Sequence, residues 1–142
     1  AESARYKELK EDKYYLPEDW GEIRNSNPNL RVDANGEKYQ KWTTILRRYT
    51  ELGNSLYHQC MNDIESILGR KRAKESARFF KTYNSQIQAD IMFNMRSFAN
   101  FQKLRNSEHA QIEIRDIARE MLELVKTIDG NPFKHTLEAW GI

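Results

Sequence analysis

The chain has 142 residues, of which 39% are hydrophobic and 31% are charged, so we expect one soluble globular domain spanning residues 1–142. The formal net charge of +2 is too small to indicate a nucleic-acid-binding protein. No apolar run approaches the ~18 residues that a membrane helix needs, and no signal peptide is visible.

The first predicted feature is a short polar segment in which Ser3 and Arg5 bracket Ala4. In an extended segment these two side chains point the same way. A hydroxyl beside a guanidinium suits a phosphate, although so short a triplet more often has a structural role.

Residues 21–36 form a connector rich in Asn, Pro and Gly, which we expect to be a surface turn ahead of a helix. Within it, Asn35-Gly36 predicts a hairpin between residues 30–32 and 38–39.

Residues 37–68 have the periodicity of one long core helix. Its apolar stripe consists of Trp42, Ile45, Tyr49, Leu52, Leu56, Cys60, Ile64 and Ile67. A break near Gly53-Asn54 is the alternative to a continuous helix. Gly69 follows as the predicted C-terminal cap.

The single cysteine, Cys60, leaves no internal disulfide, so a reducing cytoplasm is the expected compartment. Its place on the apolar stripe favours a buried structural thiol over a nucleophile. His58, His109 and His135 show no metal-ligand spacing with it, so we expect no metal site.

Residues 70–74 are a short basic run that leads into a second predicted helix, residues 72–82. A solvated helix start is the favoured interpretation, and a phosphate or nucleic-acid patch is the alternative. Residues 86–93 then alternate between apolar and polar side chains, which predicts a half-buried strand.

The predicted strand leads into a helical segment, residues 94–115, with a polar row beside an apolar seam. Asn94, Arg96, Asn100 and Arg105 stand among Phe93, Phe98, Phe101 and Leu104. In a helix, Arg96 and Asn100 project from the same side, and Phe98, Phe101 and either Leu104 or Arg105 form the neighbouring stripe. Guanidinium and amide groups suit phosphates and heterocycle edges, and a helix N-terminus attracts anions. On composition alone, a solvated face is the commoner explanation.

Residues 108–128 give the clearest helix, with Ser107 as its predicted N-cap and residues 129–132 as its stop. Its broad apolar face predicts burial between elements or between subunits. Residues 133–140 predict a short final helix.

Three sequence segments resemble motifs of one family, the flavin-dependent thymidylate synthases or ThyX proteins. NMRSFANFQKLRNSEHAQIEIR, residues 94–115, is similar without a gap to the family's block Asn-x-Arg-Ser-Leu-x-x-Phe-x-x-Leu-Arg, then His-Ala-Gln-x-Glu-Ile-Arg. Residues 2–6, ESARY, match the end of its signature Arg-His-Arg-x-x-Ser-x-Asn-Glu-x-Ser-x-Arg-Tyr. Residues 75–78, ESAR, resemble its Glu-x-Ala-Arg.

The chain also departs from the family pattern. Ala1 stands where the family has Glu. Residues 79–84 follow Arg78 where the family usually continues with Leu-Pro, so the resemblance does not predict the backbone conformation of these residues. The earlier part of the signature, with the Arg-His-Arg that helps to hold flavin, is missing. We therefore expect the C-terminal two-thirds of a ThyX subunit. The rest is a separate polypeptide, is disordered and not represented, or is lost.

The resemblance implies an α+β fold that is mainly helical with a small antiparallel sheet and lacks the N-terminal part of the family fold. It also implies a homotetramer with each flavin where subunits meet. The implied reaction converts dUMP to dTMP with methylenetetrahydrofolate as one-carbon donor, FAD as cofactor and NADPH as reductant. The chain has no Gly-x-Gly-x-x-Gly turn, so flavin would bind without a Rossmann turn.

Residue roles follow from the same resemblance. Ser3, Arg5 and Arg78 bind dUMP, mainly its phosphate and sugar. Arg105 also binds dUMP and is the catalytic residue, because it reaches the uracil ring and stabilises the charge that develops there. The residues implied to line FAD are Asn94, Arg96, Asn100 and His109.

Two other functions stay open. One is a split or divergent family member, either a pyrimidine-nucleotide hydroxymethylase or an inactive subunit, which product mass would identify. The other is a non-enzymatic helical interaction module that binds nucleic acid through residues 70–74, with salt-sensitive affinity.

Overall fold

The computed structural model describes residues 8–27, 29–30 and 39–142. Ser3, Arg5 and the hairpin predicted at Asn35-Gly36 lie outside the described residues. The chain divides into two compact units, Ala1–Asp90 and Ile91–Ile142. The prediction of a mainly helical protein is confirmed. None of the described helices is both long enough and apolar enough to cross a membrane.

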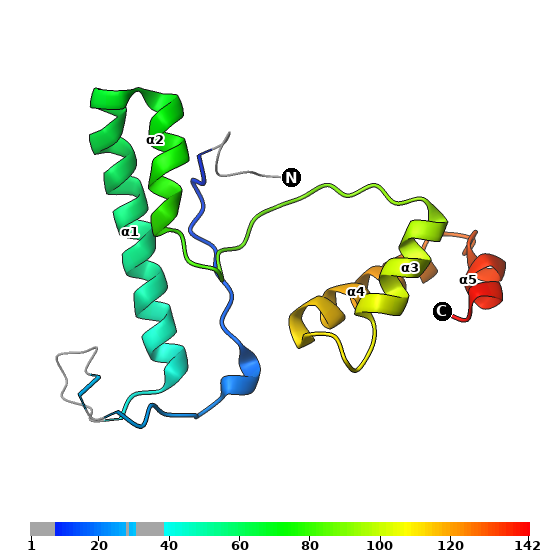
Figure 1. The fold of residues 1–142 in the computed structure, drawn as a ribbon. Coiled ribbons are helices and arrows are strands. Elements are labelled where there is room, and N and C mark those ends of the chain that lie inside the picture. Colours follow the sequence, from blue (N-terminus) through cyan, green and yellow to red (C-terminus); the bar gives the residue numbers. More distant parts are fainter. Residues whose placement is uncertain (1–7, 28, 31–38) are drawn as a thin grey trace. The chain divides into compact units, whose positions relative to one another are not determined.

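A helical hairpin forms the body of the first unit. Helix α1, Trp42–Leu68, is followed after Gly69 by α2, Arg70–Ala77, and the two lie side by side (Figure 1). The turn between them needs Gly69, whose φ is 81°, and the N–H of Gly69 caps α1 by donating to Glu65 O at 3.1 Å. The predicted cap is therefore confirmed, whereas α1 starts five residues later than the periodicity indicated.

Helix α1 runs unbroken through Gly53, so the predicted alternative of a break is wrong. Gly53 is buried, and a Cβ at this position would lie 2.5 Å from the carbonyl oxygen of Phe80. Phe80 ends the short 3-10 helix η2, Arg78–Phe80, which follows α2. Because Gly53 has no side chain, η2 can approach α1 closely at this position.

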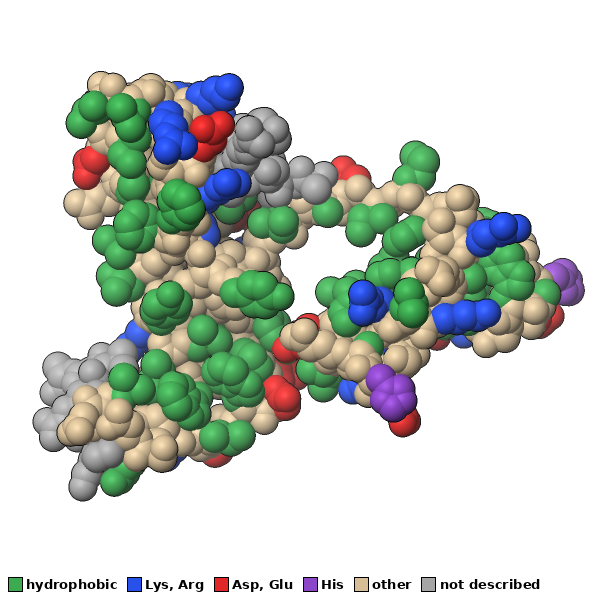
Figure 2. Space-filling model, in the orientation of Figure 1, with side chains coloured by type: hydrophobic (Ala, Val, Ile, Leu, Met, Phe, Trp, Pro, Cys, Tyr) green, Lys and Arg blue, Asp and Glu red, His purple; other side chains and the backbone are tan. Residues whose placement is uncertain are grey.

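The buried face of α1 is not the predicted stripe. Its buried residues are Thr50, Gly53, Asn54, Tyr57 and Met61. The small Ala73 and Ala77 of α2 pack here together with Leu9, so this face meets the hairpin partner. Much of the predicted apolar stripe is exposed instead, with Tyr49 64% and Ile67 80% accessible, and Figure 2 shows hydrophobic side chains on the surface of this unit. Cys60 packs against this core but is half-buried rather than buried, so the predicted buried thiol is confirmed only in part.

The segment before the short helix η1, Glu18–Trp20, runs along the hairpin and pairs with the chain after η2. Tyr15 N donates to Asn84 O at 2.9 Å, and Gln86 N donates to Lys13 O at 2.9 Å. Strand pairing in the described residues is limited to two isolated antiparallel bridges, Tyr14 with Ser85 and Arg24 with Lys41. The predicted small sheet is therefore not confirmed.

The strand predicted over residues 86–93 does not form. Pairing with the N-terminal segment stops near the Tyr14–Ser85 bridge, and no described segment continues the ladder. Ile87 and Ile91 are consequently exposed. An alternating pattern needs a neighbouring strand to become a strand, and here the neighbour ends first.

The second unit contains three helices: α3, Met95–Arg105; α4, Ile112–Lys126; and α5, Lys134–Trp140. They enclose a small core formed by Phe98, Leu122 and Leu137. Helix α4 begins later than predicted, and Ser107 is not its N-cap. Instead, Ser107 O accepts a hydrogen bond from Ala110 N at 3.1 Å, so residues 106–111 form a turn between α3 and α4.

Candidate functional site

The N-terminus of α3 is built on Asn94. Asn94 has an extended backbone, and its Oδ1 accepts a 2.8 Å hydrogen bond from Ser97 N, which satisfies one free N–H of the first turn. This bond occupies the carbonyl half of the amide. The NH2 half makes no hydrogen bond within the described residues and remains able to donate to a ligand.

Arg96 and Asn100 extend a polar row along the exposed side of α3. They are four residues apart, so their side chains leave the same face of the helix. Both are exposed, and neither side chain has a partner among the described residues. The opposite side packs inward through the buried Phe98 and Gln102. The predicted polar row is confirmed for Arg96 and Asn100, and the predicted apolar seam is confirmed for the buried Phe98 but not for Leu104, which is 58% exposed.

Arg105 is the last residue of α3 and leaves the helix in a different direction. It follows Arg96 by nine residues, or about 2.5 turns, which places the two guanidinium groups on opposite sides of the helix. Arg105 is exposed and has no ion-pair partner in the part of the chain that is described. Helix α3 can therefore present guanidinium groups to two different ligands, or to two parts of one ligand.

The remaining candidates lie in separate segments. His109 is exposed in the turn between α3 and α4. Arg78 belongs to the first unit, where it opens η2, and its exposed guanidinium has no partner among the described residues. The structure thus brings Asn94, Arg96 and Asn100 together on one helix and places His109 and Arg78 elsewhere.

Two buried polar atoms near the start of α4 lack hydrogen-bond partners in the described structure. They are Oε2 of Glu113 and Nε of Arg115. An unpaired buried polar atom costs free energy, so each of these atoms is expected to find a partner in water, in a ligand or in another chain. Sequence reasoning did not single these residues out. Their only signal in the sequence is that they belong to the family block His-Ala-Gln-x-Glu-Ile-Arg, which begins at His109.

The basic run contributes to ion pairs within the chain. Arg70 binds Glu8 at 2.9 Å and Glu65 at 3.1 Å, and Arg72 lies 3.6 Å from Glu75. These contacts support the interpretation of residues 70–74 as a solvated helix start and weaken the nucleic-acid alternative.

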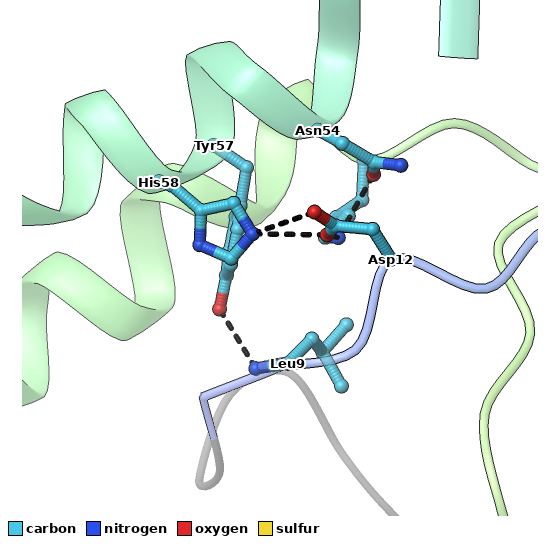
Figure 3. Close-up of polar contacts among 6 residues, drawn as sticks. Leu9, Asp12, Asn54, Tyr57 and His58 are labelled. Carbon is cyan, nitrogen blue, oxygen red and sulfur yellow. Dashed lines mark hydrogen bonds and ion pairs between the residues drawn. The ribbon is translucent and has the colours of Figure 1, made fainter. Parts of the chain in front are cut away.

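A polar cluster that sequence reasoning missed joins α1 to the N-terminal segment (Figure 3). Asp12 lies 2.9 Å from Nε2 of His58 and 2.9 Å from Nζ of Lys81. Lys81 Nζ also donates to Oδ1 of Asn54 at 2.9 Å and lies 4.7 Å from the ring centre of Tyr57. Partial burial works to raise the pKa of Asp12, but hydrogen bonds and charges from Lys81 and His58 outweigh it and lower that pKa.

The fold and this surface define a mainly helical protein that presents unpaired guanidinium and amide groups to solvent. A family model described as "Thymidylate synthase complementing protein" matches residues 1–129. The chain therefore belongs to this family, the ThyX family, whose curated members carry the name flavin-dependent thymidylate synthase.

Individual relatives agree with the family match. The flavin-dependent thymidylate synthase of Gluconobacter oxydans is 35% identical over 130 residues, which cover 87% of this chain and 40% of that protein. That of Thermococcus onnurineus is 30% identical over 102 residues, 71% of this chain and 37% of the relative. That of Mycobacteroides abscessus is 25% identical over 129 residues, 82% of this chain and 49% of the relative.

The chain spans less than half the length of each of these relatives. No solved structure matches the chain.

Proposed function

We propose that the chain is a subunit of an FAD-dependent thymidylate synthase that methylates dUMP to dTMP with methylenetetrahydrofolate and NADPH. One observation carries the proposal. Within the family-matched residues 1–129, Arg78, Arg96 and Arg105 are exposed and have no partner in the described residues. Guanidinium groups without carboxylate partners are suited to phosphate-bearing ligands.

The residues of α3 fit the chemistry of FAD. The cofactor carries phosphates and a heterocycle with hydrogen-bonding edges, and the free donors here are the Asn94 amide, Arg96 and Asn100. The unpaired Nε of Arg115 is a further donor nearby in sequence. When bound, FAD supplies the redox chemistry of the methyl transfer. Asn94, Arg96 and Asn100 would hold it, with His109 in the following turn.

In the proposed function, dUMP is bound mainly by arginines. Ser3, Arg5 and Arg78 would hold the phosphate and sugar of dUMP. Arg105 would place a fixed positive charge at the uracil ring, where negative charge develops during the reaction. Cys60 packs against the core, which agrees with a reaction that uses no cysteine nucleophile.

An apolar surface supports the proposed homotetramer. On α1, the exposed side chains of Tyr49, Leu52 and Leu56 recur at helical spacing and have no cover within the first unit. A subunit interface would remove this face from water. A separate polypeptide that carries the remaining length of the relatives is the alternative cover, because the chain spans 40% of the Gluconobacter protein.

The first experiment is a visible absorption spectrum of the purified protein without added cofactor. A flavin band, followed by dTMP formation from dUMP, supports the proposal, and the product mass separates methylation from hydroxymethylation. If the protein is colourless, FAD and dUMP are added with and without the N-terminal part of a relative as a second polypeptide. Binding that requires this polypeptide identifies a split enzyme. No binding under either condition contradicts the proposal.

A further inference from the structure

Two side chains close the last turn of α3, where a glycine cap is usual. The helix ends at Arg105, and the next residue, Asn106, has a φ of −92° and so does not adopt the left-handed conformation of a glycine cap. Its N–H donates to Gln102 O at 2.8 Å, and its Nδ2 donates to Gln102 Oε1 at 3.0 Å. Asn106 is therefore fastened to Gln102 through both its backbone and its side chain.

Gln102 is in turn fastened to α4. Its side chain is 2% exposed, and its Nε2 donates a 2.8 Å hydrogen bond to the backbone oxygen of the buried Ala118. Both ends of the amide are thus bonded, as a buried amide requires. Gln102 stands at a position that the family block leaves unspecified, so the motif does not account for it.

Arg105 lies between the two fastened residues. Gln102 precedes it by three residues, and Asn106 follows it directly. The ends of helices fray, because their last carbonyl groups lack partners within the helix, and α3 has only 11 residues. Fraying of α3 at this end would displace Arg105, whereas Asn94 and Arg96 stand at the other end of the helix.

We propose that Gln102 and Asn106 are positioning residues that hold Arg105 in fixed register with the donors at the start of α3. This inference rests on the proposed function, in which Arg105 places its charge at the uracil ring. Neither positioning residue contacts the substrate. A charge that is already in place needs no reorganisation during the reaction, so a frayed turn would lower the rate of dTMP formation.

The test replaces Gln102 by methionine, which keeps the length of the side chain and removes its hydrogen bonds. Hydrogen exchange of the Asn106 amide reports on the last turn of α3, and exchange of the Phe98 amide, which donates to Asn94 O at 2.9 Å, reports on the first. We expect Gln102→Met to speed exchange at Asn106 about tenfold and to leave Phe98 unchanged. Gln59→Met, the same replacement at an exposed position of α1, should match the wild type.

Kinetics on the whole protein separate positioning from a merely structural role. We expect Gln102→Met to lower kcat about tenfold while the flavin spectrum stays the same. In an Arg105→Ala background, measured in single turnovers, Gln102→Met should lower the residual rate no further, because it acts through Arg105. An equal fall in both backgrounds overturns the inference. So does an unchanged kcat or unchanged exchange at Asn106.

A second variant keeps the inference testable if Gln102→Met does not fold. Asn106→Ala removes only the side-chain bond at a half-buried position, and a wild-type kcat in this variant also overturns the inference. Wild-type protein that forms no dTMP refutes the proposed function and removes the inference with it. Wild-type protein that forms dTMP at the same rate as Gln102→Met refutes the inference alone, so the two failures are distinguishable.

Discussion

The side-chain amide of Gln102 donates a 2.8 Å hydrogen bond to the backbone carbonyl of Ala118, and both residues are buried. The other end of the same amide accepts a 3.0 Å hydrogen bond from Asn106, which follows α3. A single polar side chain thereby ties α3 to α4 and to the turn between them. This bond adds a directed contact to the apolar packing that orients α3 against α4.

Replacing Gln102 should loosen the second unit. Gln102→Ala removes both hydrogen bonds and leaves a cavity at a side chain that is 2% exposed, so we expect a loss of about 2 kcal/mol in the free energy of unfolding. Denaturant titration followed by circular dichroism measures it. Gln111→Ala is the matched control, because Gln111 is exposed and its side chain makes no cap bond. Equal stability of the two variants would contradict this role for Gln102.

Asn94 has two roles that substitutions can separate. Asn94→Asp keeps the oxygen that accepts from Ser97 N, so thermal stability should stay near that of the wild type. The aspartate cannot donate and repels phosphate, so FAD affinity should fall about tenfold. Asn94→Ala should lose the same affinity and about 1 kcal/mol of stability. Fluorescence titration with FAD and thermal melts give the two readouts, and full FAD affinity in Asn94→Asp would exclude the amide as a ligand.

Arg105→Ala should abolish turnover while the fold survives. Arg105 is exposed and unpaired among the described residues, so its removal should change stability by less than about 0.5 kcal/mol. Loss of the charge that stabilises the developing negative charge on the uracil ring should lower dTMP formation by about 100-fold or more. Lys103→Ala, a neighbouring exposed cation on α3, should remain active. Unchanged dTMP formation in Arg105→Ala would refute the assigned role.

Gly53→Ala should destabilise the first unit. Alanine favours a helix over glycine by about 1 kcal/mol, but the new Cβ would lie 2.5 Å from the backbone oxygen of Phe80. Overpacking of this kind costs about 1–3 kcal/mol, so the expected net loss in the free energy of unfolding is at most about 2 kcal/mol. Ser55→Ala, at an exposed position of α1, should not destabilise. A Gly53→Ala protein more stable than the wild type would show that η2 moves away without cost.

The cluster around Asp12 should make stability depend on pH in the acid range. Folding lowers the pKa of Asp12 below its ordinary value of 3.8, so the carboxylate stabilises the folded protein above that value. The stabilisation is lost as pH falls through the lowered pKa of the folded state. The difference in melting temperature between wild type and Asp12→Asn should therefore be largest near about pH 7 and should close toward about pH 2. A difference that is constant over this range would contradict the lowered pKa.

Local pattern predicted the helices because periodicity is a property of consecutive residues. It located α1, α3, α4 and α5, and it placed Arg96 and Asn100 on a different face of α3 from the buried Phe98. It chose the wrong buried face for α1, because side-chain type alone does not reveal that the small Ala73 and Ala77 of α2 pack against Tyr57. The more apolar stripe remains exposed within the first unit.

Features that depend on distant residues were not predictable. The sequence suggested a break in the helix at Gly53, because the reason for a glycine there is its contact with the carbonyl oxygen of Phe80, a residue far along the chain. No local pattern marks Gln102 or Lys81, and only the packing of distant segments shows that each is buried and hydrogen-bonded. For the candidate site, the motifs supplied the candidate residues, and the structure shows which of their side-chain groups have no partner among the described residues.

The linking segment, residues 87–92, has consequences for handling the protein at high concentration. It alternates like a strand, exposes Ile87, Ile91 and a 97% accessible Met92, and has no partner strand among the described residues. A strand-like stretch with an open edge is a template for pairing with another copy of itself. Pairing through this edge would depend on a few residues outside both cores, so raising the melting temperature of either unit would not by itself prevent it.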